Sequence, residues 1–418
     1  MILTLKTVFN IKVCVLSRDI LTRPRVGLRA ALLSPALLVG LACTPSEATS
    51  PWEDDAFRDA AVEVVDHYGV LVAANYDATL AGAQTLDAAI AAFLAAPSEA
   101  TLGEARAAWI AARTPYGETE AFRFYNGPID GEPDGVEGRI NAWPLDEVYI
   151  DYVEGAPMGG IINDPATYPT IDTEALIAAN EALGEDTIST GWHAIEFLLW
   201  GQDMDPVGPG DRPFADYVDG AEATAANPER RRTYLELVSA LLVEDLEGVA
   251  LAWTAGGDNY RADFVADDPK EGVRKMLLGM GSLSGAELAG ERMTVAYETR
   301  EQEDEHSCFS DNTHNDLIAN ARGIENVYLG RYGAVNGPGI SALVARLDEA
   351  LDQRMRDELA ASVAAMEAIP APFDQAIQAP EGSPEREAVA AAIAALQTQT
   401  KTIAEVAELL EIELNLEE

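Results

Sequence analysis

The chain has 418 residues, a formal net charge of −43 at pH 7 and a pI near 4.2, and 48% of its residues are hydrophobic. So large a negative charge repels phosphate backbones and argues against nucleic acid as a partner. The length suffices for two or three domains, and the hydrophobic fraction suffices to bury a core.

The first 42 residues have the pattern of a secretory signal peptide. Three arginines between positions 23 and 29 precede an apolar run that ends in "GLAC" at Cys43. This ending resembles a bacterial lipobox, although Gly40 stands where leucine is usual. We therefore expect an exported lipoprotein that is anchored to a membrane through lipid on Cys43, in the periplasm or at the cell surface, with residues 43–51 as a tether. The alternative is ordinary cleavage nearby. We expect no later segment to be long enough to span a membrane.

Beyond the tether, alanine-rich apolar patterns predict helices almost throughout. One long helix from about residue 52 runs into a second, and another begins with Ser98 as its N-cap. Residues 125–170 are rich in Gly, Pro, Asp and Asn and are predicted to form a long irregular excursion, of the kind that usually has a functional reason. Within it, residues 147–153 are the only stretch that resembles a strand.

Helical patterns resume near residue 172 and continue to the closing helix, in which apolar residues recur every three or four positions. An all-α fold follows, with one helical bundle over residues 52–256 and a second over 257–418. The segments "AIEFLLWG" (194–201) and "GIENVYLG" (323–330) share isoleucine, glutamate and a closing glycine. We interpret the two bundles as products of an ancient internal duplication, with the irregular excursion inserted in the first half.

The segment "GWHAIEFLLWG" raises the question of chemistry, because it carries His193 and Glu196 at the head of an apolar helix. Residues three apart on a helix face the same way, so both side chains can point into one space, and Gly191 leaves room beside the imidazole. An imidazole nitrogen and a carboxylate together suit Zn²⁺, Fe or Mn²⁺. No second histidine follows four residues later, which excludes the helix motif of zinc proteases.

Further ligands must come from other segments. Glu303-x-x-His306 and Asp311-x-x-His314 have spacings that could present two ligands each, and "AARTPYGETEAFRF" (111–124) ends an apolar helix with charged residues. The alternative interpretation of these residues is an ordinary polar loop and a solvated helix end. On chemical grounds we predict a metal site of His193, Glu196, Glu120, Asp311 and His314, in a cleft between the bundles that is lined by Gly191, Arg113, Arg322 and Glu325.

Three blocks of the sequence resemble the imelysin-like family, in its iron-regulated protein A branch. "GWHAIEFLLWGQD" looks like the Gly-x-His-x-x-Glu signature of that family, while "EHSCFSDNTHNDLIANARGIENVYLGRYG" and "AWIAARTPYGETEAFRFYNGPID" are similar to two further blocks. The resemblance runs from about Ala56 to the C-terminus. It implies two duplicated helical bundles in an exported or lipid-anchored bacterial protein associated with iron acquisition. It also makes Gly191, His193 and Glu196 the signature residues.

Three functions are consistent with these observations. The first is a binding protein that captures a divalent or ferric metal ion, with iron favoured over zinc, or a small iron-bearing ligand, and that works with an outer-membrane iron-uptake partner. The second is a metal-dependent peptidase, as the family was first classed, in which Glu196 or Glu120 would activate metal-bound water. The third is a non-catalytic structural or interaction protein in which His193 only makes hydrogen bonds.

Overall fold

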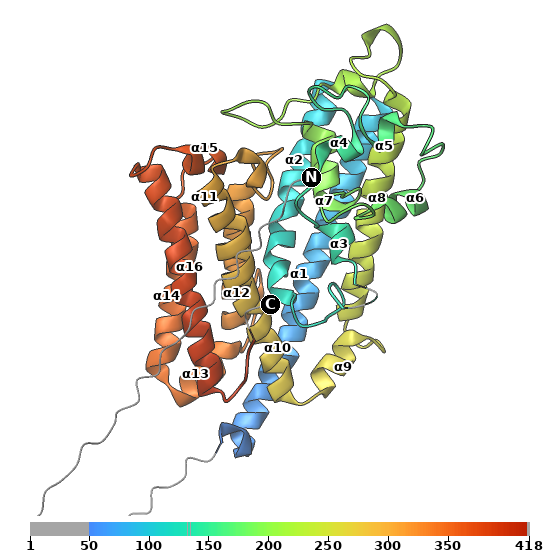
Figure 1. The fold of residues 1–418 in the computed structure, drawn as a ribbon. Coiled ribbons are helices and arrows are strands. Elements are labelled where there is room, and N and C mark those ends of the chain that lie inside the picture. The colour runs from blue at the N-terminus through green and yellow to red at the C-terminus, as the bar shows by residue number, and fades with distance from the viewer. Residues whose placement is uncertain (1–49, 132, 134, 416–418) are drawn as a thin grey trace, which may run out of the picture. The chain divides into compact units, whose positions relative to one another are not determined.

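The computed structural model describes residues 50–131, 133 and 135–415, and these residues are mostly helical (Figure 1). The all-α prediction is confirmed at this level. The helices of the first half are η1 (Pro51–Glu53), α1 (Asp55–Ala95), α2 (Glu99–Thr119), η2 (Glu120–Phe122), α3 (Glu137–Ile140), α4 (Glu147–Ile150), α5 (Gly160–Asn163), α6 (Thr173–Ala179), α7 (Gly191–Trp200), η3 (Phe214–Tyr217), η4 (Gly220–Glu222) and α8 (Pro228–Trp253).

The second half continues with helices that are joined by short loops and one small hairpin. They are α9 (Tyr260–Ala266), α10 (Pro269–Ser282), the π-helix η5 (Leu283–Val295), α11 (Ala296–Thr299), η6 (Gln302–Asp304), α12 (Thr313–Leu329), α13 (Ile340–Leu347), α14 (Glu349–Glu367), α15 (Phe373–Gln378) and α16 (Pro384–Leu409). The hairpin pairs β1 (Arg331–Tyr332) with β2 (Val335–Asn336) in antiparallel register.

Helix α1 packs along α2 and α8, and these three helices stand side by side in Figure 1. The Asp54 carboxylate caps α1, and Ser98 forms a capping box with Thr101 at the start of α2, as predicted for Ser98. By length and composition α1 is apolar enough to cross a membrane, so the expectation that no later segment would be long enough is wrong. Apolar side chains of α1, such as Val64 and Leu71, are buried in the core of this structure.

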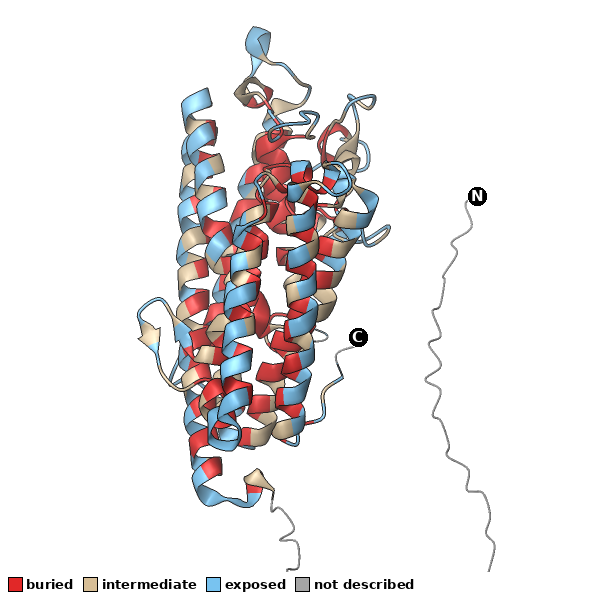
Figure 2. Cartoon of the chain, turned by 90° about the vertical axis from the view of Figure 1, so that its left-hand side faces the viewer, coloured by how far each residue is buried: buried red, intermediate tan, exposed pale blue. Residues whose placement is uncertain are grey.

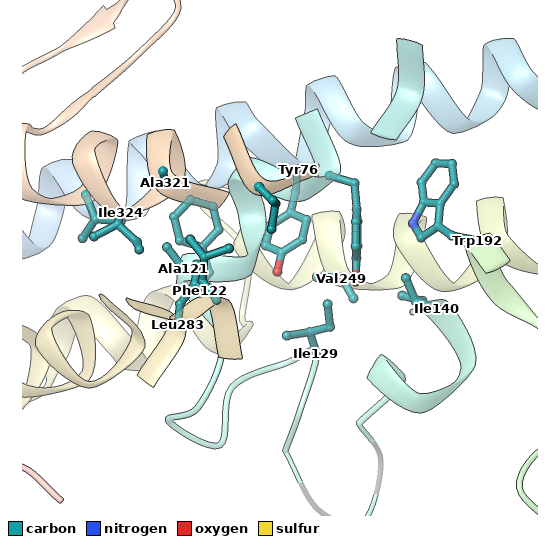
Figure 3. Packing of buried hydrophobic residues seen from close by; sticks show 14 of the residues in the cluster. Tyr76, Ala121, Phe122, Ile129, Ile140, Trp192, Val249, Leu283, Ala321 and Ile324 are labelled. Atoms are coloured by element: carbon teal, nitrogen blue, oxygen red, sulfur yellow. The ribbon is translucent and has the colours of Figure 1, made fainter. Parts of the chain in front are cut away.

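The helices of the second half pack on one another and on the first half. Helix α16 contacts α14 and η5, while α12 contacts α14 on one side and α2 on the other. Buried residues follow the inner faces of the helices and exposed residues the outer faces (Figure 2). Figure 3 shows Phe122 of η2 in one buried cluster with Leu283 of η5 and Ile324 of α12. Both halves therefore share one hydrophobic core, and a domain boundary near residue 256 stays a prediction.

Two further sequence predictions can be compared with the structure. The strand expected at residues 147–153 is wrong: the Asp146 carboxylate caps a single helical turn, α4, by accepting a hydrogen bond from Val148 N. Helices α7 and α12, which carry the internal echo, both end at a glycine of positive φ, Gly201 and Gly330. This shared ending is consistent with a duplication, which itself stays a prediction.

Candidate metal-binding site

Helix α7 begins at Gly191, a position where the backbone conformation and the space available both require glycine. Gly191 has a φ of +82°, and a Cβ atom there would lie 2.4 Å from the Ile140 carbonyl oxygen and 2.6 Å from that of Arg139. Only glycine adopts this conformation without strain and leaves room for the neighbouring backbone. The close approach fixes the first turn of α7 against the end of α3, which places His193 in the interior.

His193 and Glu196 contact each other, as their spacing predicted. His193 Nδ1 lies 2.9 Å from Glu196 Oε2, and both side chains are fully buried. The other carboxylate oxygen, Glu196 Oε1, accepts hydrogen bonds from Ser310 N (3.0 Å) and Ser310 Oγ (2.6 Å). His193 Nε2 is buried and has no hydrogen-bond partner among the described residues. One ring nitrogen of this histidine is therefore held in place, and the other is free.

A second histidine lies against the first. The ring centroids of His193 and His306 are 4.8 Å apart, and the Trp143 ring is also 4.8 Å from His193. Burial lowers the pKa of His193 well below its usual value, and His306 lowers it further, so His193 is neutral at pH 7. The sequence offered only one signal for His306, the Glu303-x-x-His306 spacing, and the ligand set predicted from the sequence does not include it.

Burial acts in the opposite direction on the carboxyl group of this pair. It raises the pKa of Glu196 to about 8, although the hydrogen bonds from Ser310 and the Arg113 guanidinium lower it. The protein alone therefore stabilises the ionised form of Glu196 poorly, and the carboxyl group is mostly protonated at pH 7. A cation bound at His193 Nε2 would change that balance.

A buried ion pair between an arginine and an aspartate lies next to His306. Arg113 Nη2 donates to Asp316 Oδ2 at 2.9 Å and Arg113 Nε to Asp316 Oδ1 at 3.3 Å, with both side chains buried. His306 Nδ1 lies 3.4 Å from Asp316 Oδ2 and 3.5 Å from Arg113 Nη2. Burial by itself would raise the pKa of Asp316, but Arg113 and His306 outweigh it and hold that pKa far below its usual range. Asp316 is a permanent anion that fixes His306.

Glu120, predicted as a metal ligand, belongs to a neighbouring ion-pair network. Its Oε1 accepts a hydrogen bond from Asn141 Nδ2 at 3.2 Å, and its Oε2 accepts one from Arg292 of η5. Asn141 in turn accepts a 2.6 Å hydrogen bond from Arg113 Nη1. Burial would raise the pKa of Glu120, but Arg292 and Arg123 lower it overall. Glu120 is therefore already paired with the protein's own cations.

A cavity of about 500 Å³ borders His306 and Trp143. Two arginines lie on its wall, Arg123 and Arg292, and both pair with acidic side chains. Acidic residues outnumber these cations: Glu137, Glu181, Glu185, Glu287, Glu291 and Asp304. Part of this wall is the 13-residue π-helix η5, a rare conformation that is frequent at functional sites. The cavity favours a positively charged occupant.

The remaining predicted residues are not brought to His193. Arg322 and Glu367 form an exposed ion pair at 2.7 Å, and Glu325 pairs with Arg331 at 2.8 Å. His314 is half-buried; burial lowers its pKa and Glu367 raises it.

Burial, with Asp374, Asp203 and Asp205, raises the pKa of Asp311 to about 7. In the part of the chain that the structure describes, no three His, Cys, Asp or Glu side chains are arranged to hold a metal ion. Cys43, the predicted lipidation site, lies outside the described residues.

Comparisons with known proteins cover most of the chain. The sequence profile of the imelysin family matches residues 72–403. Iron-regulated protein A of Synechococcus elongatus is 26% identical over 353 residues, which is 82% of either chain. A solved structure of a Parabacteroides distasonis protein assigned as an iron-regulated protein A precursor has a TM-score of 0.62 at 19% identity, over 83% of this chain and 95% of that one. An imelysin-like protein from Psychrobacter arcticum has a TM-score of 0.61 at 13% identity, over 85% and 97%.

Proposed function

Since this chain belongs to the imelysin family, we propose that it is a binding protein that takes a metal ion, or a small metal-bearing ligand, into the acidic cavity bordered by His306, whose ring packs on that of the buried His193. The metal is cargo in this proposal. The observation that carries it is the free ring nitrogen: His193 Nε2 is buried without a hydrogen-bond partner among the described residues. A buried polar atom left in this way costs about 1–3 kcal/mol, so its retention calls for a ligand.

The contacts of Glu196 support the same interpretation. A carboxylate that accepts a hydrogen bond from Nδ1–H leaves the Nε2 lone pair free for a metal, which is the usual arrangement around metal-bound histidines. Glu196, with both its oxygens engaged by His193 and Ser310, would then position the imidazole and would not itself bind the metal. His306, whose ring packs on that of His193, is the natural second imidazole.

The cavity supplies the remaining chemistry. Carboxylates on its wall can contribute oxygen ligands or attract the cation, and imidazole with carboxylate suits iron and zinc. The names of the Synechococcus and Parabacteroides relatives concern iron regulation, which favours iron as the cargo here. With export and a lipid anchor at Cys43, the protein would act in iron acquisition outside the cytoplasm, next to an outer-membrane uptake partner.

Metal binding by the purified chain tests the proposal. We expect dialysis against micromolar Fe²⁺ or Zn²⁺, followed by elemental analysis, to give about one metal per chain for the wild type. His193→Ala and His306→Ala should each remove it. His314→Ala is the matched control and should retain the metal, because His314 lies away from the cavity. Absence of metal in the wild type would overturn the proposal. Casein hydrolysis that a chelator abolishes would favour the peptidase instead.

A further inference from the structure

A second pocket, with a volume of about 620 Å³, lies at the C-terminal end of α7, whereas His193 lies in the first turn of that helix. The segment after α4, the end of α7 and the loop from α7 to η3 line it. Among the described residues, its lining and that of the cavity beside His306 have no member in common. Its apolar lining includes Tyr152, Trp200 and Met204. We call it the Arg212 pocket, after its basic lining residue.

The guanidinium of Arg212 is buried, and the protein holds it by one nitrogen. Nη1 donates to Asp151 Oδ2 at 2.6 Å and to Asp216 Oδ2 at 3.3 Å. Nε is buried and has no hydrogen-bond partner among the described residues. Nη1 is the one side-chain nitrogen of Arg212 that donates a hydrogen bond to a described residue. The edge formed by Nε and Nη2, which binds carboxylates through two parallel hydrogen bonds, is therefore free.

The neighbouring Arg231 shows the usual arrangement. Its Nε and Nη2 donate to the two oxygens of Asp151 at 2.6 and 2.8 Å, and its Nη1 donates to the Asp216 carbonyl at 2.8 Å. Arg231 thus uses on Asp151 the same edge that Arg212 leaves free. The two arginines and the two aspartates balance each other in charge. Because a buried donor without an acceptor is unfavourable, the free edge of Arg212 calls for an acceptor from outside this cluster.

The contacts of Arg212 on its other sides leave the pocket as the place for that acceptor. The ring centroids of Tyr152 and Phe197 lie 5.0 and 5.2 Å from its guanidinium carbon. Its backbone N donates to the Trp200 carbonyl at 2.7 Å, which fixes the residue at the end of α7. At Gly201, another lining residue, a Cβ atom would lie 3.4 Å from Arg212 Nε. Since glycine has none, no side chain of that residue covers Nε, and the guanidinium is held in place before a ligand arrives.

The other charged residues of the lining are acidic. Glu154, Asp205 and Asp211 border the pocket, and all three are exposed. A ligand that carried only negative charge would be repelled by these carboxylates on its way to Arg212. A ligand with a carboxylate and an ammonium group matches both, because its carboxylate meets the guanidinium and its ammonium group meets the acidic residues.

We propose that the Arg212 pocket binds a free α-amino acid with a large apolar side chain. The carboxylate accepts hydrogen bonds from the free edge of Arg212, and the ammonium group lies near Glu154 and Asp205. The side chain packs against Trp200, which is buried, and Met204, which is 63% exposed and whose flexible thioether can adapt to it. This inference does not depend on the proposed function, because it concerns a different pocket and involves no metal.

Calorimetric titration of the full chain tests the inference. With a chelator present, we expect L-phenylalanine or L-leucine to bind at one saturable site. Hydrocinnamate has the carboxylate and ring of phenylalanine without the ammonium group, and phenethylamine has the ammonium group and ring without the carboxylate. Each should bind more weakly than L-phenylalanine by about tenfold or more, the equivalent of one lost hydrogen bond to a charged group.

Variants locate the site. Arg212→Lys keeps the positive charge without the free edge and should abolish binding of the amino acid. Met204→Ala should weaken binding, whereas Met158→Ala is the matched control, because Met158 is 60% exposed and lies outside this pocket. Met204 is exposed, so this pair keeps the test decisive even if Arg212→Lys does not fold. The double variant of Glu154→Gln and Asp205→Asn should weaken binding of L-phenylalanine and not that of hydrocinnamate.

Three results would overturn the proposal. The first is that neither L-phenylalanine nor L-leucine binds to the wild type. The second is that hydrocinnamate or phenethylamine binds as tightly as L-phenylalanine, which would show that the pocket does not recognise both charges. The third is that Met204→Ala and Met158→Ala bind the amino acid alike. His193→Ala should leave amino acid binding intact, which separates this pocket from the proposed metal site.

Discussion

Replacing Arg113 by methionine should destabilise the protein by about 3–5 kcal/mol, the usual cost of breaking a buried ion pair by removing one partner. The change leaves Asp316 buried with an uncompensated charge. Two hydrogen bonds to that carboxylate remain, from Ser307 Oγ at 2.5 Å and Asn312 Nδ2 at 3.1 Å. Since hydrogen bonds to a charged group are worth about 1.5–3 kcal/mol each, they should hold the loss near the lower end of the range.

The aromatic surroundings of Arg113 add a smaller contribution. Its guanidinium carbon lies 5.6 Å from the ring centroid of Trp109, 5.3 Å from that of Tyr116 and 5.7 Å from that of Trp192. Cation–π contacts contribute about 0.5–2 kcal/mol, and the methionine thioether retains part of the contact with the rings. Methionine is therefore preferable to alanine, because it removes the charge and leaves little cavity.

A double-mutant cycle isolates the pair. Arg113→Met, Asp316→Asn and the double variant are compared with the wild type by urea denaturation, followed through tryptophan fluorescence. Each single variant leaves a buried partner unpaired, so the double variant should lose at least about 1 kcal/mol less than the sum of the single losses. The pKa of His306 should also rise in Arg113→Met, since Arg113 is one of the groups that lower it, and imidazole NMR measures this. Additive losses, or a single loss below about 1 kcal/mol, would refute the reasoning.

Two other predictions concern stability. Gly191→Ala should cost at least about 1–3 kcal/mol in thermal denaturation, from its positive φ and the clash with the Ile140 carbonyl, whereas Gly103→Ala, with open space around it, should be neutral or stabilising. Equal effects would contradict the close approach. Stability should be highest near pH 5 without added metal: the raised pKa of Glu196, about 8, removes stability as the pH rises through that value, and the depressed pKa of Asp316 removes it as the pH falls below about 4. Urea midpoints that increase from pH 5 to pH 8 would contradict this.

Local patterns in the sequence predicted the local structure. The Ser98 cap follows from the chemistry of a single turn, and the contact between His193 and Glu196 follows from helical geometry, which brings residues three apart onto one face. The family resemblance is confirmed by the match over residues 72–403. The strand predicted at 147–153 failed because a short apolar alternation also fits a single capped turn, and the Asp146 cap decided the outcome.

The contacts between segments could not be predicted in the same way. His306 packs on His193 from a loop more than a hundred residues away, and nothing in the spacing of either segment specifies that approach. The spacing of Asp311 and His314 suggested a ligand pair, yet neither is brought to His193: Asp374, Asp203 and Asp205 influence the pKa of Asp311, and Glu367 influences that of His314. Which polar residue meets which depends on helix packing, and the packing is specified by the apolar residues of the core.

The buried ionisable groups of this molecule are of two kinds: acids that are paired with arginine, and groups that have no partner among the described residues. The chain has 71 acidic residues against 28 lysines and arginines, so its basic residues cannot neutralise every carboxylate. Arginines are placed where Asp316 and Glu120 are buried, which makes those acids part of the framework. The carboxylate oxygens of Glu305 have no hydrogen-bond partner among the described residues, and neither has the buried Nε2 of His193. Other described side chains also have unpartnered buried atoms, His314 Nδ1 among them, but the free nitrogen of His193 lies against His306 at the acidic cavity, where we propose a cation as its partner. Failure of the wild type to bind a cation beside His193 would show that this free nitrogen is not a ligand-binding feature.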